Sequence, residues 1–182
     1  RPRNTIVAID AKGAILAKYS KIHLFTPGKE DLNYSAGDTL GTFTIDGCSC
    51  GLAICYDLRF SDLFRLYRQQ GVDLMLVPSA WPTSRMRFFE LFTTSRAAEY
   101  QMYVACVNTT GTTPVDQYSG GSLVAGPDGV VITRGSQGEE LLFTHIDPGR
   151  VAEIRKTFPV YHDRKEDLYN RLEGESVPPC QP

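Results

Sequence analysis

The chain has 182 residues, 42% of them hydrophobic and 22% charged, which is usual for a globular domain with its own core. The formal net charge of -2 creates no basic field that would attract nucleic acid or an anionic membrane surface, and no apolar run approaches the ~20 residues that span a bilayer. The composition therefore predicts neither a nucleic-acid nor a membrane partner, and a cytoplasmic location is expected.

The first third of the chain is expected to be mainly β-structure. Residues 1–4 carry neither a signal peptide nor an initiator methionine, so the chain is expected to begin inside a fold. The expected strands share runs of apolar or alternating residues between turn signals and cover residues 5–10, 14–19, 39–45 and 49–54. Asp46-Gly47 is a hairpin signal, and the polar residues 26–38 are expected to form a surface loop.

The rest of the chain alternates helices and strands. Helices are expected from Ser61 to Gly71, over residues 85–101, and from Pro148. The expected strands are apolar runs at residues 72–78, 102–108, 122–125, 130–133 and 140–146. Residues 1–170 are expected to form one domain, followed by an extended tail at residues 171–182. Strands mixed with covering helices favour an α/β layered fold.

The strongest signal for chemistry is the cysteine in residues 51–60, Gly-Leu-Ala-Ile-Cys-Tyr-Asp-Leu-Arg-Phe. Cys55 is expected where a buried strand stops and a helix begins, so that its thiol projects from the sheet edge and the Tyr56 N–H points at a bound group. Such a position can lower the pKa of the thiol and supply an oxyanion hole. The alternative is a buried structural cysteine, the commoner role of free cysteines.

A cysteine nucleophile needs a base, and histidine is the familiar one. The three histidines, at positions 23, 145 and 162, are scattered along the chain, so a Cys–His pair stays open but has no local support. The spacing of the five cysteines indicates no disulfide framework and lacks the second ligand pair of a zinc site. The sequence therefore predicts reduced thiols, no metal and no cofactor.

A second signal is the lysine in residues 18–25, Lys-Tyr-Ser-Lys-Ile-His-Leu-Phe. Lys21 alternates with apolar neighbours, so it can point inward from a strand end. An ammonium beside a thiol favours the thiolate and can stabilise a tetrahedral oxyanion. Glu30 follows in the next loop and can fix that ammonium through a charge-assisted hydrogen bond. The alternative is a solvated lysine at a strand end.

Together these segments resemble the nitrilase (carbon–nitrogen hydrolase) superfamily. The resemblance rests on Tyr-Ser-Lys-Ile-His-Leu-Phe, on the cysteine segment and on Val-Pro-Ser-Ala-Trp-Pro, in that order. Further segments, at residues 95–101 and 158–169, extend it over nearly the whole chain. It implies a four-layer αββα sandwich and a small-molecule amide as substrate. It also implies a homodimer or larger homo-oligomer.

The resemblance further implies catalysis by a Glu–Lys–Cys triad. Cys55 would be the nucleophile, Lys21 the cation near the oxyanion, and Glu30 the second glutamate that many members place in this loop. The family's general-base glutamate lies on an early strand before the lysine, yet residues 1–20 contain no glutamate. The N-terminal portion of the sandwich, with this base, is therefore expected to be missing from the chain.

Within the superfamily the chain looks most like the ω-amidase branch, which hydrolyses side-chain amides of α-keto acids such as 2-oxoglutaramate. One alternative is an N-carbamoyl amino-acid hydrolase or another branch. An alternative of another class is a catalytically incomplete fragment or assembly subunit. Trp81 is a candidate wall of the substrate site. Arg59 and Arg96 each suit either a substrate carboxylate or a structural acid.

Overall fold

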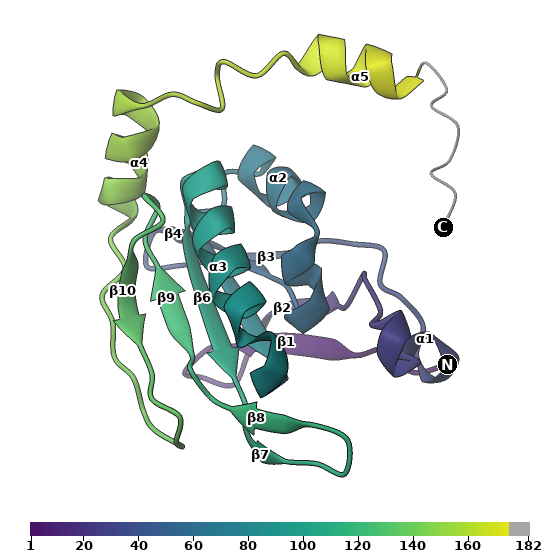
Figure 1. Ribbon diagram of the computed structural model, residues 1–182. Helices are drawn as coiled ribbons and strands as arrows, with labels where there is room; N and C mark the ends of the chain where they lie inside the picture. Colours follow the sequence, from purple (N-terminus) through teal and green to yellow (C-terminus); the bar gives the residue numbers. More distant parts are fainter. Residues whose placement is uncertain (175–182) are drawn as a thin grey trace.

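The computed structural model describes residues 1–174. Its centre is a six-stranded sheet in the order β10-β9-β6-β5-β4-β3 (Figure 1). The strands of this sheet are β3 (Gly41–Ile45), β4 (Cys48–Leu52), β5 (Leu74–Ser79), β6 (Tyr103–Asn108), β9 (Leu123–Ala125) and β10 (Val131–Arg134). β4, β5 and β6 run parallel, so their carboxyl ends meet at one edge.

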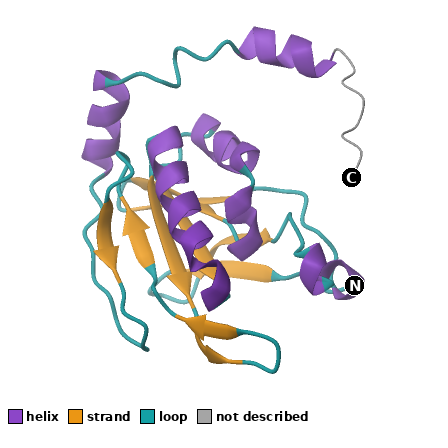
Figure 2. Ribbon diagram, in the orientation of Figure 1, coloured by secondary structure: helices purple, strands orange, loops and turns teal. Residues whose placement is uncertain are grey.

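Two helices cover one face of this sheet (Figure 2). They are α2 (Ser61–Gln69) and α3 (Met86–Tyr100), and each presents an apolar side to the strands. Phe64 and Phe89 are fully buried against Met75 and Val77 of β5. Gly51 in β4 is required by this packing, because a Cβ there would lie 2.6 Å from the Met75 sulfur.

A hairpin covers part of the opposite face. β1 (Thr5–Ile9) pairs antiparallel with β2 (Ile15–Ser20), which confirms the first predicted hairpin. Tyr19 and apolar residues of both strands pack on Leu52 and Leu76 of the large sheet. The described residues thus form three successive layers in the order helix, sheet, sheet.

Several local predictions were wrong. Residues 140–146 are not a strand: within the described chain they bond to no neighbouring strand, and Leu141 and Phe143 are 78% and 83% exposed. Residues 26–38 are not all loop, because they contain a 3₁₀ turn, η1 (Thr26–Gly28), and α1 (Glu30–Asn33).

The strands β7 (Thr110–Thr112) and β8 (Gln117–Ser119) form a small hairpin that the sequence did not predict. They are short and rich in polar residues, which weakens any periodic signal. The predicted helix at Pro148 is confirmed as α4 (Pro148–Thr157). Residues 171–174 belong to α5 (Glu166–Gly174), so the predicted extended tail is wrong there, and its remainder lies outside the described residues.

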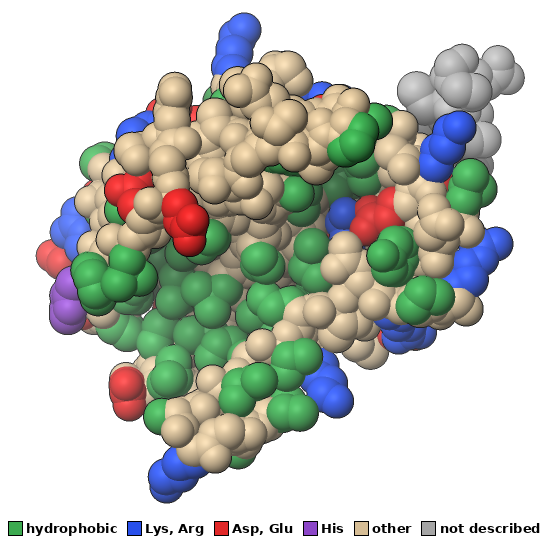
Figure 3. Space-filling model, turned by 90° about the horizontal axis from the view of Figure 1, so that it is seen from below, with side chains coloured by type: hydrophobic (Ala, Val, Ile, Leu, Met, Phe, Trp, Pro, Cys, Tyr) green, Lys and Arg blue, Asp and Glu red, His purple; other side chains and the backbone are tan. Residues whose placement is uncertain are grey.

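Apolar side chains also gather at the surface. Figure 3, which shows the molecule from below the view of Figure 1, has hydrophobic side chains clustered over part of this side. Along the described chain, no helix has the length and apolarity needed to cross a bilayer.

Candidate active site

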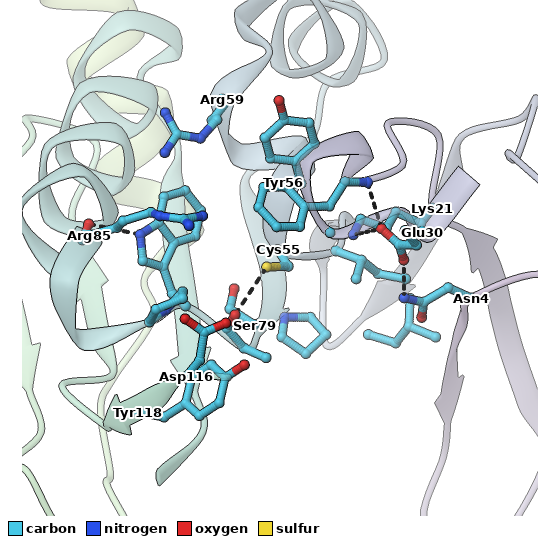
Figure 4. A pocket seen from close by; sticks show the side chains of 18 of the residues that line it. Asn4, Lys21, Glu30, Cys55, Tyr56, Arg59, Ser79, Arg85, Asp116 and Tyr118 are labelled. Atoms are coloured by element: carbon cyan, nitrogen blue, oxygen red, sulfur yellow. Dashed lines mark hydrogen bonds and ion pairs between the residues drawn. The ribbon is translucent and has the colours of Figure 1, made fainter. Parts of the chain in front are cut away.

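A cavity of about 700 Å³ lies at the carboxyl ends of the parallel strands, between the β1–β2 hairpin and the β7–β8 hairpin (Figure 4). Crevices outside the carboxyl ends of strands are the usual ligand sites of open α/β sheets. The side chains that line it include Lys21, Glu30, Cys55, Tyr56, Arg59, Trp81, Arg85, Asp116 and Tyr118. The cavity therefore contains all five residues predicted as catalytic or substrate-binding.

Cys55 starts the turn η2 (Cys55–Arg59), which follows β4 after two residues. Its backbone has a φ of 48°, in the left-handed region that side chains other than glycine rarely adopt. This turn aims the thiol at the cavity, and the Sγ–H donates a weak hydrogen bond to the Ala80 carbonyl at 3.8 Å. Tyr56 is the second residue of this turn. The first N–H groups of a helical turn have no acceptor within the turn, so the Tyr56 N–H is free to donate to a bound group.

The expectation that this position lowers the pKa of the thiol is wrong for the described chain. Burial raises the pKa of Cys55 above its ordinary value, and it outweighs the bond to Ala80 and the charge of Lys21, which both lower it. The nearby carboxylates of Glu30 and Asp57 raise it further. The resting thiol is therefore protonated at neutral pH, and nucleophilic attack by it requires a base.

Lys21 and Glu30, which also line the cavity, form a buried ion pair. The side chains are 4% and 14% exposed, and Nζ of Lys21 lies 2.6 Å from Oε2 of Glu30. The backbone of Lys21 is fixed on both sides, by bonds to the Asn4 carbonyl and from the Gly37 N–H. Gly37 must be glycine, because a Cβ would lie 2.0 Å from the Ser20 carbonyl oxygen. Lys21 is thus a held, desolvated cation and not a solvated surface lysine.

Glu30 accepts two further hydrogen bonds, from the Phe25 N–H at 2.7 Å and from the Asn4 amide at 2.9 Å. Burial by itself would raise the pKa of Glu30, but the bonds from Lys21, Asn4 and Phe25 outweigh it and hold the pKa below its usual value. Glu30 is therefore ionised at neutral pH and fully occupied in holding Lys21.

This pKa predicts the acid stability of the protein. Because the folded-state pKa of Glu30 lies below the unfolded value, its stabilisation is complete above the unfolded value and is lost as the pH falls through the folded pKa. The Glu30→Gln variant should therefore melt lower than the wild type near pH 7 and lose less stability between about pH 5 and pH 3. Thermal melts across this range will test it. Parallel Tm curves would contradict it, and Asp31→Asn, at the half-buried neighbouring carboxylate, is the control.

A buried carboxylate ties the lysine segment to the cysteine segment. Asp57 is fully buried and accepts hydrogen bonds from the Tyr19 hydroxyl at 2.7 Å and the Ile54 N–H at 2.9 Å. Its other oxygen lies 2.9 Å from both the backbone N and Nδ1 of His23. Since Tyr19 and His23 flank Lys21 while Ile54 precedes Cys55, one side chain fixes the relative position of the two segments.

None of the three histidines lines the cavity. His23 is turned toward Asp57 and stacks on Phe60 at a ring distance of 3.7 Å. His145 and His162 are exposed. The structure therefore gives no support to a Cys–His pair.

Of the other cysteines in the described chain, Cys48, Cys50 and Cys106 are buried. Burial raises the pKa of both Cys50 and Cys106 to about 12. Within residues 1–174, no group of three His, Cys, Asp or Glu side chains is arranged to hold a metal ion. Among the described cysteines, Cys55 is thus the one that faces the cavity.

Trp81 lines the cavity but is only 3% exposed. Its indole N–H donates to the Arg85 carbonyl at 2.8 Å, and its ring packs on Phe89. Arg96 does not line the cavity. Its guanidinium donates to Glu99 and to the Arg59 carbonyl, so Arg96 pairs with a structural acid and not with a substrate carboxylate. Arg59 does line the cavity.

Sequence reasoning missed four groups around the site: Asn4, Asp57, Arg85 and Asp116. Asp57 had a local signal, because an acid at the third position of a helical turn often accepts a bond from the residue that precedes the turn. Arg85 lies four residues after Trp81, a spacing that one turn of helix brings together. Asn4 and Asp116 reach the site only through the pairing of distant segments, which spacing along the chain does not reveal.

Comparisons with known proteins agree with this geometry. Residues 1–156 match the family model for carbon-nitrogen hydrolases. The chain is 36% identical over 166 residues to the 2-oxoglutaramate amidase of Bacillus subtilis (strain 168), a match covering 91% of this chain and 64% of that protein. It is 37% identical over 175 residues to the omega-amidase NIT2 of Homo sapiens, covering 91% and 63%. The chain therefore spans just under two thirds of the length of these curated relatives.

The fold matches solved structures as well. One is the crystal structure of a CN-hydrolase superfamily protein from Xanthomonas campestris with an arsenic adduct in its active site. It superimposes with a TM-score of 0.83 at 29% sequence identity, over 90% of this chain and 64% of that one. This likeness confirms the predicted α/β fold class.

Proposed function

The chain belongs to the carbon-nitrogen hydrolase family, and from this membership we infer that it carries the nucleophile and the oxyanion cation of an amidase. The observation that supports this most directly is the placement of Cys55 and the buried Lys21–Glu30 pair on the walls of one cavity. Burying the Lys21–Glu30 ion pair costs desolvation energy, and such a pair is not expected without a function. Because Lys21 shares its cavity with the Cys55 thiol, this favours a role for Lys21 in the chemistry. No metal or cofactor enters the proposed reaction.

In the proposed reaction Sγ of Cys55 attacks the amide carbonyl carbon as a base removes the thiol proton. The carbonyl oxygen becomes an oxyanion, which the Lys21 ammonium and the Tyr56 N–H stabilise. The C–N bond then breaks, the leaving nitrogen takes a proton, and ammonia departs from a Cys55 thioester. Water, deprotonated by the base, attacks the thioester and releases the carboxylic acid and the free thiol.

The base for these two steps lies outside the two carboxylates that influence the pKa of Cys55. Glu30 accepts three hydrogen bonds, one of them from Lys21, and Asp57 is fully buried with both oxygens bonded. We therefore propose that a glutamate outside residues 1–182 supplies the base, as the family resemblance implies. This makes an incomplete catalytic unit the second candidate for the isolated chain.

The proposed substrate is the side-chain amide of a small carboxylic acid, such as 2-oxoglutaramate. The names of the Bacillus and human relatives support it, and a cavity of about 700 Å³ has room for such a molecule. An N-carbamoyl amino-acid substrate is the alternative within the family. Self-association and a cytoplasmic location stay predictions.

Steady-state ammonia release tests the proposal. The intact protein should hydrolyse 2-oxoglutaramate with a kcat/KM at least about 10²-fold above that for N-carbamoyl amino acids, since a mismatched polar group in a buried site is strongly rejected. Residues 1–182 alone should show at most one slow acylation and no sustained turnover, because Glu30 and Asp57, the two carboxylates that raise the pKa of Cys55, are both occupied by hydrogen bonds. Faster turnover of the carbamoyl compounds would contradict the proposed substrate. Robust turnover by residues 1–182 would contradict the proposal that the base lies outside them.

A further inference from the structure

The wall of the cavity opposite Lys21 carries a guanidinium without an acid partner. Arg85 ends the turn η3 (Thr83–Arg85), and Figure 4 shows its side chain reaching toward the middle of the cavity. Among the described residues it forms no ion pair, whereas Arg134, Arg150 and Arg155 each bind a carboxylate. Among the aromatic rings of the described residues, the one close to it is that of Phe25, 5.4 Å from the guanidinium carbon.

The backbone beneath Arg85 is held rigidly. The Trp81 indole N–H donates to the Arg85 carbonyl at 2.8 Å. Trp81 in turn is clamped by Asn108, whose side chain accepts from the Trp81 N–H at 2.7 Å and donates to the Trp81 carbonyl at 3.1 Å. Thr83 is bonded to the β7–β8 hairpin through the Gln117 carbonyl at 2.9 Å. A cation on so fixed a support is preorganised to receive an anion.

The other arginine of the cavity is placed differently. The guanidinium carbon of Arg59 lies 5.0–5.9 Å from the centres of four aromatic rings, Tyr56, Trp81, Phe88 and Phe92. These ring faces stabilise its charge and leave it in an apolar enclosure. Within the described chain Arg59 thus lies among four aromatic rings, whereas the Arg85 guanidinium has one such ring, that of Phe25.

The charges of the cavity also favour an anion. Lys21 and Glu30 neutralise each other, and Asp116 offsets one of the two arginines. One positive charge is left over. Figure 4 draws no ion pair between Asp116 and Arg85, so the guanidinium group of Arg85 stays available.

We propose that Arg85 binds the carboxylate of the substrate and so sets the specificity for amides of short carboxylic acids. This rests on the proposed amidase function. A guanidinium presents two parallel N–H donors that match a carboxylate, and it does so here across the cavity from the wall that holds Lys21. With the carboxylate held at Arg85, the amide end of the same molecule extends toward Cys55. Arg85 thus selects which amide reaches the thiol.

The test compares two amides that differ at one end. Glutaramate carries a carboxylate four carbons from the amide carbonyl, and pentanamide has a methyl group there. In the intact protein, Arg85→Met should lower kcat/KM for glutaramate about 30-fold, mainly through KM, as expected for a lost charge-assisted pair. The same change should alter kcat/KM for pentanamide less than about 3-fold, because methionine keeps the apolar stem of the side chain.

The matched control is Arg87→Met, which removes the same charge from an exposed position two residues along the chain. It should leave the preference for glutaramate unchanged. Equal losses on both amides in Arg85→Met, or an unchanged preference, would overturn the proposal.

Binding measurements separate this inference from the amidase proposal. In a Cys55→Ala background, calorimetry should show glutaramate binding that Arg85→Met weakens about 30-fold. If the wild-type protein hydrolyses neither amide while this difference in Kd persists, the proposed reaction is wrong and the role of Arg85 stands. Equal Kd values with and without Arg85 would refute that role.

Discussion

Cys55→Ala should lower kcat for the amide substrate by at least about 10⁴-fold, as removal of a catalytic nucleophile does in other hydrolases. The substitution removes the attacking atom and a thiol whose hydrogen bond to the Ala80 carbonyl is weak. The Tm should change by only a few degrees, because alanine keeps the Cβ and the backbone. Ammonia release and thermal melts of the intact protein measure both quantities.

Alkylation with iodoacetamide gives the chemical counterpart. Loss of activity should follow labelling of Cys55, while Cys106, which is 1% exposed, stays unmodified in the native protein. Since burial raises the pKa of Cys55, the labelling rate of the described chain should climb with pH well beyond neutrality. Inactivation with Cys55 unlabelled would refute the assignment.

Lys21→Met should lower kcat by about 10²- to 10³-fold, the usual loss for one oxyanion donor. It should also lower the stability, by about 3 kcal/mol, because it leaves the partly buried carboxylate of Glu30 without its cation. The double variant Lys21→Met/Glu30→Gln separates the two effects. It should recover much of the stability, since no unpaired charge is left, and none of the activity.

Stopped assays and denaturant melts of the wild type, both single variants and the double variant form a complete cycle. Wild-type kcat in Lys21→Met would exclude the oxyanion role. Recovery of activity in the double variant would show that Lys21 only neutralises Glu30.

The sequence predicted the elements whose signals are local. The β1–β2 hairpin, α2, α3 and the buried strands β5 and β6 are long, periodic segments between turn residues. Residues 140–146 have the same apolar character but find no pairing partner among the described residues. An edge strand depends on its neighbour, which the segment itself does not encode.

The site was predictable where its candidate residues lie in two short sequence motifs. Cys55, Lys21 and Glu30 do line one cavity. Their separation is set by Asp57, whose bonds join residues 34 and 38 positions apart. Neither this link through Asp57 nor the raised pKa of Cys55 was predictable from the sequence. The raised pKa depends on burial by segments that are distant in sequence.

The left-handed backbone of Cys55 shows what reactivity demands of this fold. The chain places glycine at seven described positions of positive φ, and glycine adopts that shape without a steric penalty. A cysteine there is strained by about 1 kcal/mol or more. Glycine would relieve this strain, although Lys29, Asp46 and Gln101 also adopt a positive φ in the described chain. The thiol persists against this preference, so the proposed nucleophile also lies at a point of stored conformational energy.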